Sequence, residues 1–134
     1  MVGIEKNSGF TIIELLIVVV IMGLLMSLVA PTMFSKVDST KISTARAQMQ
    51  MLQTSLDTFM LDMGSYPKDL TALRESTGAG WDGPYLPKGV PLDPWGNEYQ
   101  YKQAREGRRE FLLFSLGKDG QPGGEDDAAD VIHQ

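Results

Sequence analysis

The sequence predicts an α+β fold in which one long N-terminal helix packs on a small antiparallel β-sheet. Three observations support this. An apolar run covers residues 10–29, an apolar stripe with helical spacing continues to residue 63, and two strand-like runs follow a loop-rich stretch. We therefore expect a helix with a membrane half and an amphipathic half, joined to a small head.

The run at residues 10–29 has the length and composition of a membrane helix. Glu14 is its only charged residue, and Lys6 precedes it. About 20 apolar residues let an α-helix cross a ~30 Å hydrocarbon layer, and a basic flank favours a cytoplasmic N-terminus. The run exceeds the ~7–15 residues of a secretory signal core, and no small-residue cleavage site follows it. Instead, a small residue, Gly9, lies before it.

Glu14 lies about one turn into this apolar run, where an ionised carboxylate costs several kcal/mol. A chain keeps such a group when the group has a partner. One candidate is a free α-amine, which cleavage after Gly9 would create on Phe10 of the same chain or of a neighbour. The alternative is a plain membrane anchor in which Glu14 is incidental.

Length and composition exclude several classes of protein. Of the 134 residues, those after the apolar run suffice for one small core. The net charge of −5 argues against nucleic-acid binding, which needs basic patches. The chain has no cysteine, which excludes disulfides, thiol catalysis and cysteine metal sites. A small extracytoplasmic head without disulfides needs another means of stabilisation.

The helix should continue beyond Pro31 as an amphipathic element. Apolar residues recur there at alternating spacings of three and four: Ile42, Ala45, Met49, Leu52, Leu56, Phe59 and Met63. Gly64 and Pro67 predict that the helix ends after Met63. We expect the stripe to pack on the chain's own head; a short coiled coil is the competing interpretation.

The stretch from residue 66 to residue 94 is rich in loop-forming residues. Leu70 and Leu73 indicate one short helix there, with Asp69 near its N-cap. Three residues of this stretch are expected to cover the core of the head: Trp81, Tyr85 and Leu86.

A turn and a hairpin should follow. Residues 93–97, Asp-Pro-Trp-Gly-Asn, have turn chemistry, with Trp95 expected to be buried. The runs at residues 98–102 and 110–115 are strand-like, and the charged, Gly107-containing segment between them predicts an antiparallel hairpin.

The loop at residues 115–127 is the stretch with the chemistry of a binding site. Four carboxylates and four glycines lie between Gly117 and Asp127. Such a cluster repels itself unless a cation lies among it, and Ca²⁺ prefers carboxylate and carbonyl oxygens. The pattern is not an EF-hand, and zinc would find only His133. A solvated acidic loop is the alternative.

We expect no enzyme activity and no catalytic residues. Asp126 and Asp127 are paired carboxylates, but no sugar cleft is indicated nearby. His133, the only histidine, lies next to the end of a tail that we expect to be flexible.

The N-terminal residues carry a resemblance to a known family. Gly9-Phe10-Thr11-Ile12-Ile13-Glu14-Leu15, followed by a long apolar helix, resembles the processing site of type IV prepilins and pseudopilins. The resemblance implies that a prepilin peptidase cuts between Gly9 and Phe10 and N-methylates Phe10. It also implies that Glu14 neutralises the amine of the adjacent subunit during assembly.

The C-terminal half is similar to the major pseudopilins of type II secretion systems, through the Asp-Pro-Trp-Gly-Asn turn and the acidic loop. In that family the matching loop binds Ca²⁺. The resemblance implies carboxylate ligands at Asp119, Asp126 and Asp127, with main-chain carbonyls at Leu116 and Lys118. Lys118 departs from the proline often found at that place, which does not affect ligation by a carbonyl.

The resemblance implies a type IV pilin-like fold and three segments: a leader at residues 1–9, a transmembrane and filament-core helix at 10–30, and a periplasmic head at 31–134. It implies a single-pass protein of the bacterial inner membrane. The subunit would polymerise into a helical pseudopilus that drives export of folded proteins across the outer membrane.

The implied partners are further copies of the chain, minor pseudopilins, the prepilin peptidase, the inner-membrane assembly platform with its ATPase, and inner-membrane lipid before assembly. Nucleic acid is not among them. Two alternatives remain open: a type IV pilin for surface fibres or DNA uptake, and an anchored calcium-binding module that never polymerises.

Overall fold

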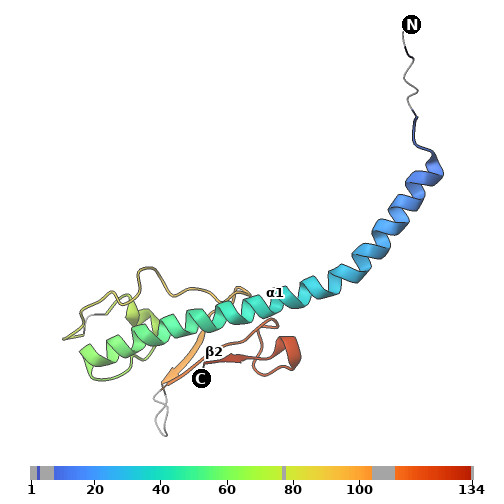
Figure 1. Ribbon diagram of the computed structural model, residues 1–134. Coiled ribbons are helices and arrows are strands. Elements are labelled where there is room, and N and C mark those ends of the chain that lie inside the picture. Colours follow the sequence, from blue (N-terminus) through green and yellow to red (C-terminus); the bar gives the residue numbers. More distant parts are fainter. Residues whose placement is uncertain (1–2, 4–7, 77, 104–110, 134) are drawn as a thin grey trace. The chain divides into compact units, whose positions relative to one another are not determined.

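A long helix and a small antiparallel sheet make up the regular structure, so the α+β prediction is confirmed (Figure 1). The computed structural model describes residues 3, 8–76, 78–103 and 111–133. Its elements in chain order are α1 (Ile12–Met63), the 3₁₀ helix η1 (Leu70–Leu73), β1 (Gln100–Gln103), β2 (Phe111–Ser115), the 3₁₀ helix η2 (Asp126–Ala128) and β3 (Val131–Ile132). The chain forms two compact units, residues 1–37 and residues 38–134.

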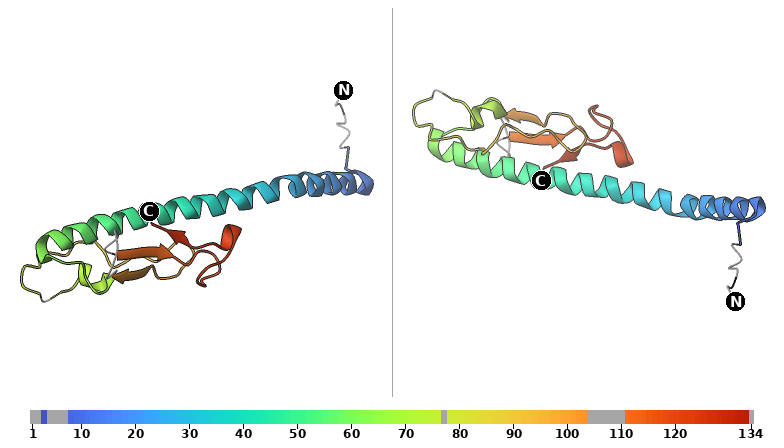
Figure 2. Two further views of the ribbon diagram at one scale, coloured as in Figure 1. Left: turned by 90° about the horizontal axis from the view of Figure 1, so that it is seen from below. Right: turned by 90° about the horizontal axis from the view of Figure 1, so that it is seen from above.

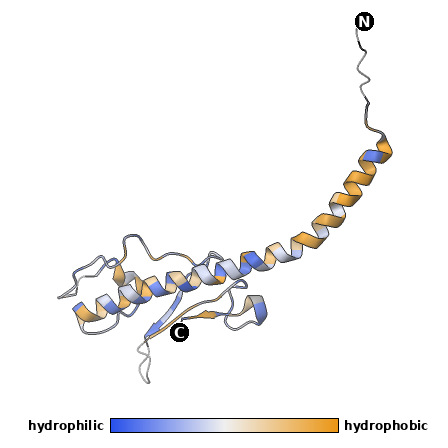
Figure 3. Ribbon diagram, in the orientation of Figure 1, coloured by the Kyte–Doolittle hydropathy of each residue, from blue (hydrophilic) through white to orange (hydrophobic). Residues whose placement is uncertain are grey.

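The first unit contains the apolar part of α1. Figure 3 shows this part coloured almost throughout as hydrophobic, and its large apolar side chains are exposed. By length and composition α1 is able to cross a membrane. Thr11 precedes the helix, and its Oγ1 accepts a hydrogen bond of 3.2 Å from the Glu14 N–H. Pro31 lies inside α1, as the pattern that resumes beyond it predicts.

The second unit is built on the C-terminal half of α1. Five members of the predicted apolar stripe are buried in it: Ala45, Met49, Leu52, Leu56 and Phe59. They pack in one cluster with residues from η1, the loops and the strands, including Leu73, Leu86, Tyr99, Leu113 and Val131. Figure 2 shows the strands lying alongside this half of the helix. The stripe therefore packs on the chain's own head, as expected.

The predicted helix boundaries are confirmed. Gly64 follows α1 with φ +78°, and its N–H donates to the Met60 carbonyl at 2.8 Å. A left-handed glycine directly after the last turn is the usual C-terminal stop. Asp69 is the N-cap of η1, where its carboxylate accepts from the Thr71 N–H at 3.0 Å.

The predicted hairpin is also confirmed. β1 pairs with β2 in antiparallel register, from Gln100 opposite Phe114 to Gln103 opposite Phe111. The expected charged connection at residues 103–109 lies, beyond Gln103, outside the described residues. Tyr101, on β1, donates its hydroxyl to the Pro67 carbonyl at 2.7 Å and so ties the hairpin to the loop before η1.

The prediction of a flexible C-terminal tail was wrong. β3 pairs with β2, with Ser115 opposite Val131 and Phe114 opposite Ile132. The His133 N–H then donates to the Leu113 carbonyl at 3.0 Å, and the His133 ring contacts the Gln53 side chain on α1. A strand of two residues has no period of its own, so only its pairing with β2 reveals it.

Burial in the core indicates which residues of α1 contribute most to the stability of the head. Leu56→Ala should destabilise the head by about 2–5 kcal/mol, because Leu56 is 0% exposed and its truncation leaves a cavity. Leu61→Ala on the same helix is the matched control, since Leu61 is 84% exposed, and its effect should stay within about 0.5 kcal/mol. Chemical denaturation of both variants measures the difference. Equal losses would contradict the assignment of the core.

Candidate functional site

The acidic loop starts from a buried polar network that joins it to the Asp-Pro-Trp-Gly-Asn turn. Asp93 is only 4% exposed. Its Oδ1 accepts from the N–H groups of Trp95 at 3.0 Å and Asn97 at 2.8 Å, which confirms the predicted turn. Its Oδ2 accepts from the hydroxyl of Ser115, the last residue of β2, at 2.5 Å. Burial, and secondarily the charge of Asp93, raises the pKa of the nearby Tyr99 hydroxyl.

At the start of the loop, both the N–H and the carbonyl of Gly117 are hydrogen-bonded. Its N–H donates to Ser115 Oγ at 3.1 Å, and its carbonyl accepts from Asn97 Nδ2 at 3.2 Å. Gly117 has φ +69°, and an added Cβ would lie 2.6 Å from the Ala129 carbonyl oxygen. Both its conformation and this close approach require glycine.

Oxygen atoms converge further along the loop. A Cβ added to Gly124 would lie 2.3 Å from the Ala128 carbonyl oxygen and 3.2 Å from Asp119 Oδ2. Asp119 Oδ1 accepts from the Gln121 N–H at 3.0 Å, which fixes the carboxylate. The side chain of Asp119 and the carbonyl from η2 therefore face the same glycine, although Asp119 and Ala128 lie on opposite arms of the loop.

The other predicted ligands belong to the same loop. Asp126 is exposed and begins η2 with φ +52°, an unusual value for a residue other than glycine. Asp127 belongs to η2 by its backbone, and its side chain lies outside the described atoms. Leu116 and Lys118 flank Gly117. Lys118 Nζ also lies 3.5 Å from Asp38 Oδ2 on α1, a partly exposed pair worth about 0–1 kcal/mol.

Asp130 is a residue of this loop that the sequence analysis missed. Its Oδ2 accepts from the Gly123 N–H at 2.9 Å, and its own N–H donates to the Gly123 carbonyl at 3.2 Å. Its Oδ1 is buried and has no hydrogen-bond partner within the described part of the chain. In the sequence, the only indication of its role was that a further aspartate follows Asp127 by three residues. Such an orphaned carboxylate oxygen is typical of a site that holds an ion or a water.

These residues fit a hard cation. In the described part of the loop, the two groups that face Gly124 are oxygens, the Asp119 carboxylate and the Ala128 main-chain carbonyl, as Ca²⁺ prefers. Among the side chains that the structure describes, no three acidic or histidine groups come close enough to hold a metal by themselves. A site here would therefore depend on carbonyls and on Asp127.

The residues predicted for processing and assembly lie at the N-terminal end of α1. Gly9 and Phe10 precede the helix, and the Phe10 side chain is 77% exposed. Glu14 is the acidic residue of the first turn and is also exposed. With Thr11 it forms the T-x-x-E pattern of a capping box, a helix-start signal that the sequence analysis missed. The bond that forms the cap comes from the Glu14 main chain, so it does not depend on the Glu14 carboxylate.

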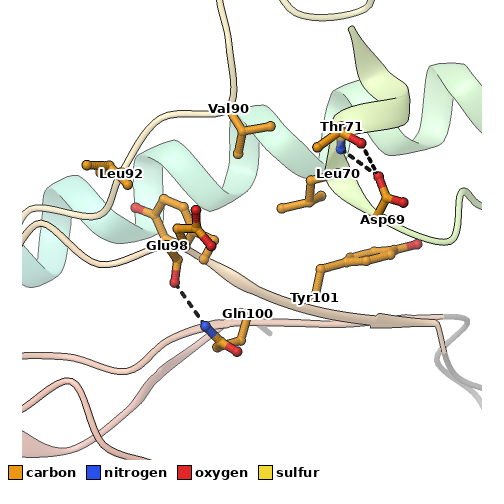
Figure 4. A pocket seen from close by; sticks show the side chains of 9 residues that line it. Asp69, Leu70, Thr71, Val90, Leu92, Glu98, Gln100 and Tyr101 are labelled. Atoms are coloured by element: carbon orange, nitrogen blue, oxygen red, sulfur yellow. Dashed lines mark hydrogen bonds between the residues drawn. The ribbon is translucent and has the colours of Figure 1, made fainter. Parts of the chain in front are cut away.

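The open pocket of Figure 4 offers no comparable chemistry. It has a volume of about 320 Å³ and lies between η1 and β1, with Leu70, Val90 and Tyr101 among its lining residues. Asp69 turns toward Thr71 in Figure 4, and the hydrogen bond from the Thr71 side chain lowers the pKa of the Asp69 carboxyl. The described lining residues include no serine, histidine, cysteine or lysine, and the hydroxyl–carboxylate bond there, from Thr71 to Asp69, belongs to the N-cap of η1.

Two family models match the chain. Residues 32–134 match the model described as type II secretion system (T2SS), protein G, and residues 5–30 match the prokaryotic N-terminal methylation motif. The first match covers the whole second unit, and the second covers the apolar helix with the residues just before it.

Similar proteins agree with these models. The type II secretion system core protein G of Pseudomonas aeruginosa is 40% identical, over 95% of this chain and 94% of that protein. The protein of the same name in Vibrio cholerae is 36% identical, over 95% and 91%. The crystal structure of the major pseudopilin from the type 2 secretion system of enterohaemorrhagic Escherichia coli matches with a TM-score of 0.59 and 27% identity, over 74% of this chain and 90% of that chain.

The sequence motifs, the long helix on a small antiparallel sheet, and the length of the matches lead to one assignment. The resemblance inferred from the processing site, the turn and the acidic loop is thereby confirmed at the level of the family. The chain belongs to the type II secretion system protein G family, the major pseudopilins.

Proposed function

We propose that the chain is the structural subunit that polymerises into the periplasmic pseudopilus of a type II secretion system and so drives export of folded proteins across the outer membrane. The observation that carries the proposal is the match of the entire head to the protein G family together with the methylation motif at its N-terminus. The role is mechanical and needs no catalytic residues.

The N-terminal part supports a processing step. In the proposal a prepilin peptidase cuts between Gly9 and Phe10, removes the leader at residues 1–9 and methylates the Phe10 amine. Before assembly the helix at residues 10–30 anchors the subunit in the inner membrane as a single span, with the head at residues 31–134 in the periplasm. The apolar, exposed surface of α1 in this region supports the anchor.

The same helix serves as the assembly element. Its apolar surface exchanges lipid for neighbouring helices in the filament core, and Glu14 pairs with the Phe10 amine of an adjacent subunit, which compensates a costly buried charge. The proposed partners are further copies of the chain, minor pseudopilins and the inner-membrane assembly platform with its ATPase.

We also propose that the acidic loop holds Ca²⁺. Asp119, Asp126 and Asp127 would supply carboxylate oxygens, and Leu116 and Lys118 would supply carbonyl oxygens. A bound ion would cross-link the two arms of the loop and tie β3 to the end of β2, in a chain that has no cysteine for a disulfide. The facing oxygens at Gly124 and the orphaned Asp130 Oδ1 support this proposal.

Deleting the gene for this chain in its native bacterium tests the function. We expect type II exoproteins to accumulate in the periplasm, with secretion restored by the wild-type chain and surface fibres unaffected. Fractionation with immunoblotting of one exoprotein measures the effect. Intact secretion with lost surface fibres or lost DNA uptake would instead assign a type IV pilin. No effect on either would indicate an anchored module that does not polymerise.

A further inference from the structure

We propose that the buried pair Asp93 and Ser115, helped by Asn97, is a positioning device for the calcium loop, and that together they set the directions of the two peptide groups that flank Gly117, including the Leu116 carbonyl oxygen. The inference rests on the proposed calcium site and adds residues that lie outside it. Neither side chain belongs to the proposed ligand set, and both are buried, with Asp93 4% and Ser115 0% exposed.

The first step is that Asp93 provides a fixed point. Its carboxylate accepts three hydrogen bonds, two from main-chain N–H groups of its own turn and one from the Ser115 hydroxyl. A buried carboxylate is tolerated when its oxygens are satisfied in this way, and the resulting network is rigid. Since Oδ2 takes the hydroxyl proton of Ser115, a lone pair of Ser115 Oγ is left to act as an acceptor.

The second step is that Ser115 orients a peptide group. Ser115 Oγ accepts the N–H of Gly117 at 3.1 Å. This N–H and the carbonyl of Leu116 belong to one trans peptide group, so they point in opposite directions. The Leu116 oxygen must therefore point away from the buried serine. That oxygen is one of the two carbonyls proposed to bind the ion.

The third step fixes the next peptide group. Asn97 Nδ2 donates to the Gly117 carbonyl at 3.2 Å, and the Asn97 N–H is itself held by Asp93. The chain therefore leaves Gly117 toward Lys118 in a set direction. Ligands that are held in place by surrounding hydrogen bonds bind a metal more tightly than free ones, and loss of such a bond typically weakens metal affinity by about 10–100-fold.

The test is calcium titration of the full-length chain in detergent micelles by isothermal calorimetry, with Ca²⁺ alone as the probe. Ser115→Ala should raise the calcium Kd by about 10-fold or more. Ser55→Ala is the matched control, because Ser55 is also buried and donates to the Tyr85 carbonyl, in a separate region of the core. Melting of both variants in chelator measures how much each change destabilises the metal-free fold.

A positioning role predicts a raised Kd only for Ser115→Ala, which should also lose more stability in chelator than Ser55→Ala because it leaves the buried Asp93 Oδ2 without its hydroxyl donor. A wild-type Kd in Ser115→Ala overturns the inference and leaves the calcium site standing. Absence of calcium binding in the wild-type chain overturns both. Should Ser115→Ala fail to fold, Asn97→Ala decides the matter: it removes the bond to the Gly117 carbonyl, so an unchanged Kd in this variant overturns the inference and a raised Kd supports it.

Discussion

Chelating calcium should lower the unfolding midpoint of the head by roughly 10–20 °C. An ion present at about 100 times its Kd stabilises a folded domain by ~2.7 kcal/mol, and 1 kcal/mol shifts the midpoint of a domain of this size by about 4–8 °C. The physical reason is that, in the proposed site, carboxylates and carbonyls from both arms of the loop would come together around the ion only in the folded head, so binding free energy would become folding free energy. Thermal unfolding of the full-length chain in micelles, with excess calcium and then with a chelator, measures the shift.

A substitution in the loop distinguishes calcium binding at this site from a general effect of calcium on stability. Asp119→Ala should melt in excess calcium near the midpoint that the wild-type chain shows in chelator, because the Asp119 carboxylate is a proposed ligand and faces Gly124 together with the Ala128 carbonyl oxygen. Glu75→Ala, which changes an exposed carboxylate outside the loop, should keep the full calcium response. If Asp119→Ala melts with the wild-type chain in calcium, the structural role of the ion is wrong.

Replacing Glu14 by glutamine should abolish filament assembly while leaving the subunit in the membrane. In the proposed filament the substitution leaves the Phe10 ammonium of a neighbour unpaired among apolar helices. Breaking a buried pair in this way costs about 3–5 kcal/mol, which weakens each subunit addition by at least ~10²-fold. Membrane insertion should persist or improve, since a charge is removed from the apolar run. Pelleting of sheared filaments, followed by electron microscopy and an immunoblot of the membrane fraction, separates the two effects.

Glutamine is chosen because it preserves the helix start. Thr11 caps the first turn by accepting the N–H of residue 14, and glutamine also suits the matching position of a capping box. A defect in Glu14→Gln therefore reports on charge rather than on helix capping. Glu75→Gln, in the head, should assemble normally. Filaments of normal abundance from Glu14→Gln would show that assembly does not depend on an ion pair at this position.

The sequence by itself determined the elements whose signals are local. The spacing of the apolar stripe predicted the buried face of α1, Gly64 predicted its end, and Asp69 predicted the start of η1. Turn chemistry predicted the turn at residues 93–97, and the two strand-like runs with the charged segment between them predicted the hairpin. Each of these signals depends on contacts between residues close in the chain, so composition and period are enough to reveal them.

Only the tertiary structure decided how distant segments combine. β3 has two residues and exists because β2 offers a free edge, so no local pattern could predict it. The bond between Asp93 and Ser115 joins residues 22 apart, and the oxygens that face Gly124 come from both arms of the loop. Asp130 likewise gains its importance from the burial of one oxygen. Burial and hydrogen-bond satisfaction are properties of the packed molecule, and the sequence specifies them only through the fold.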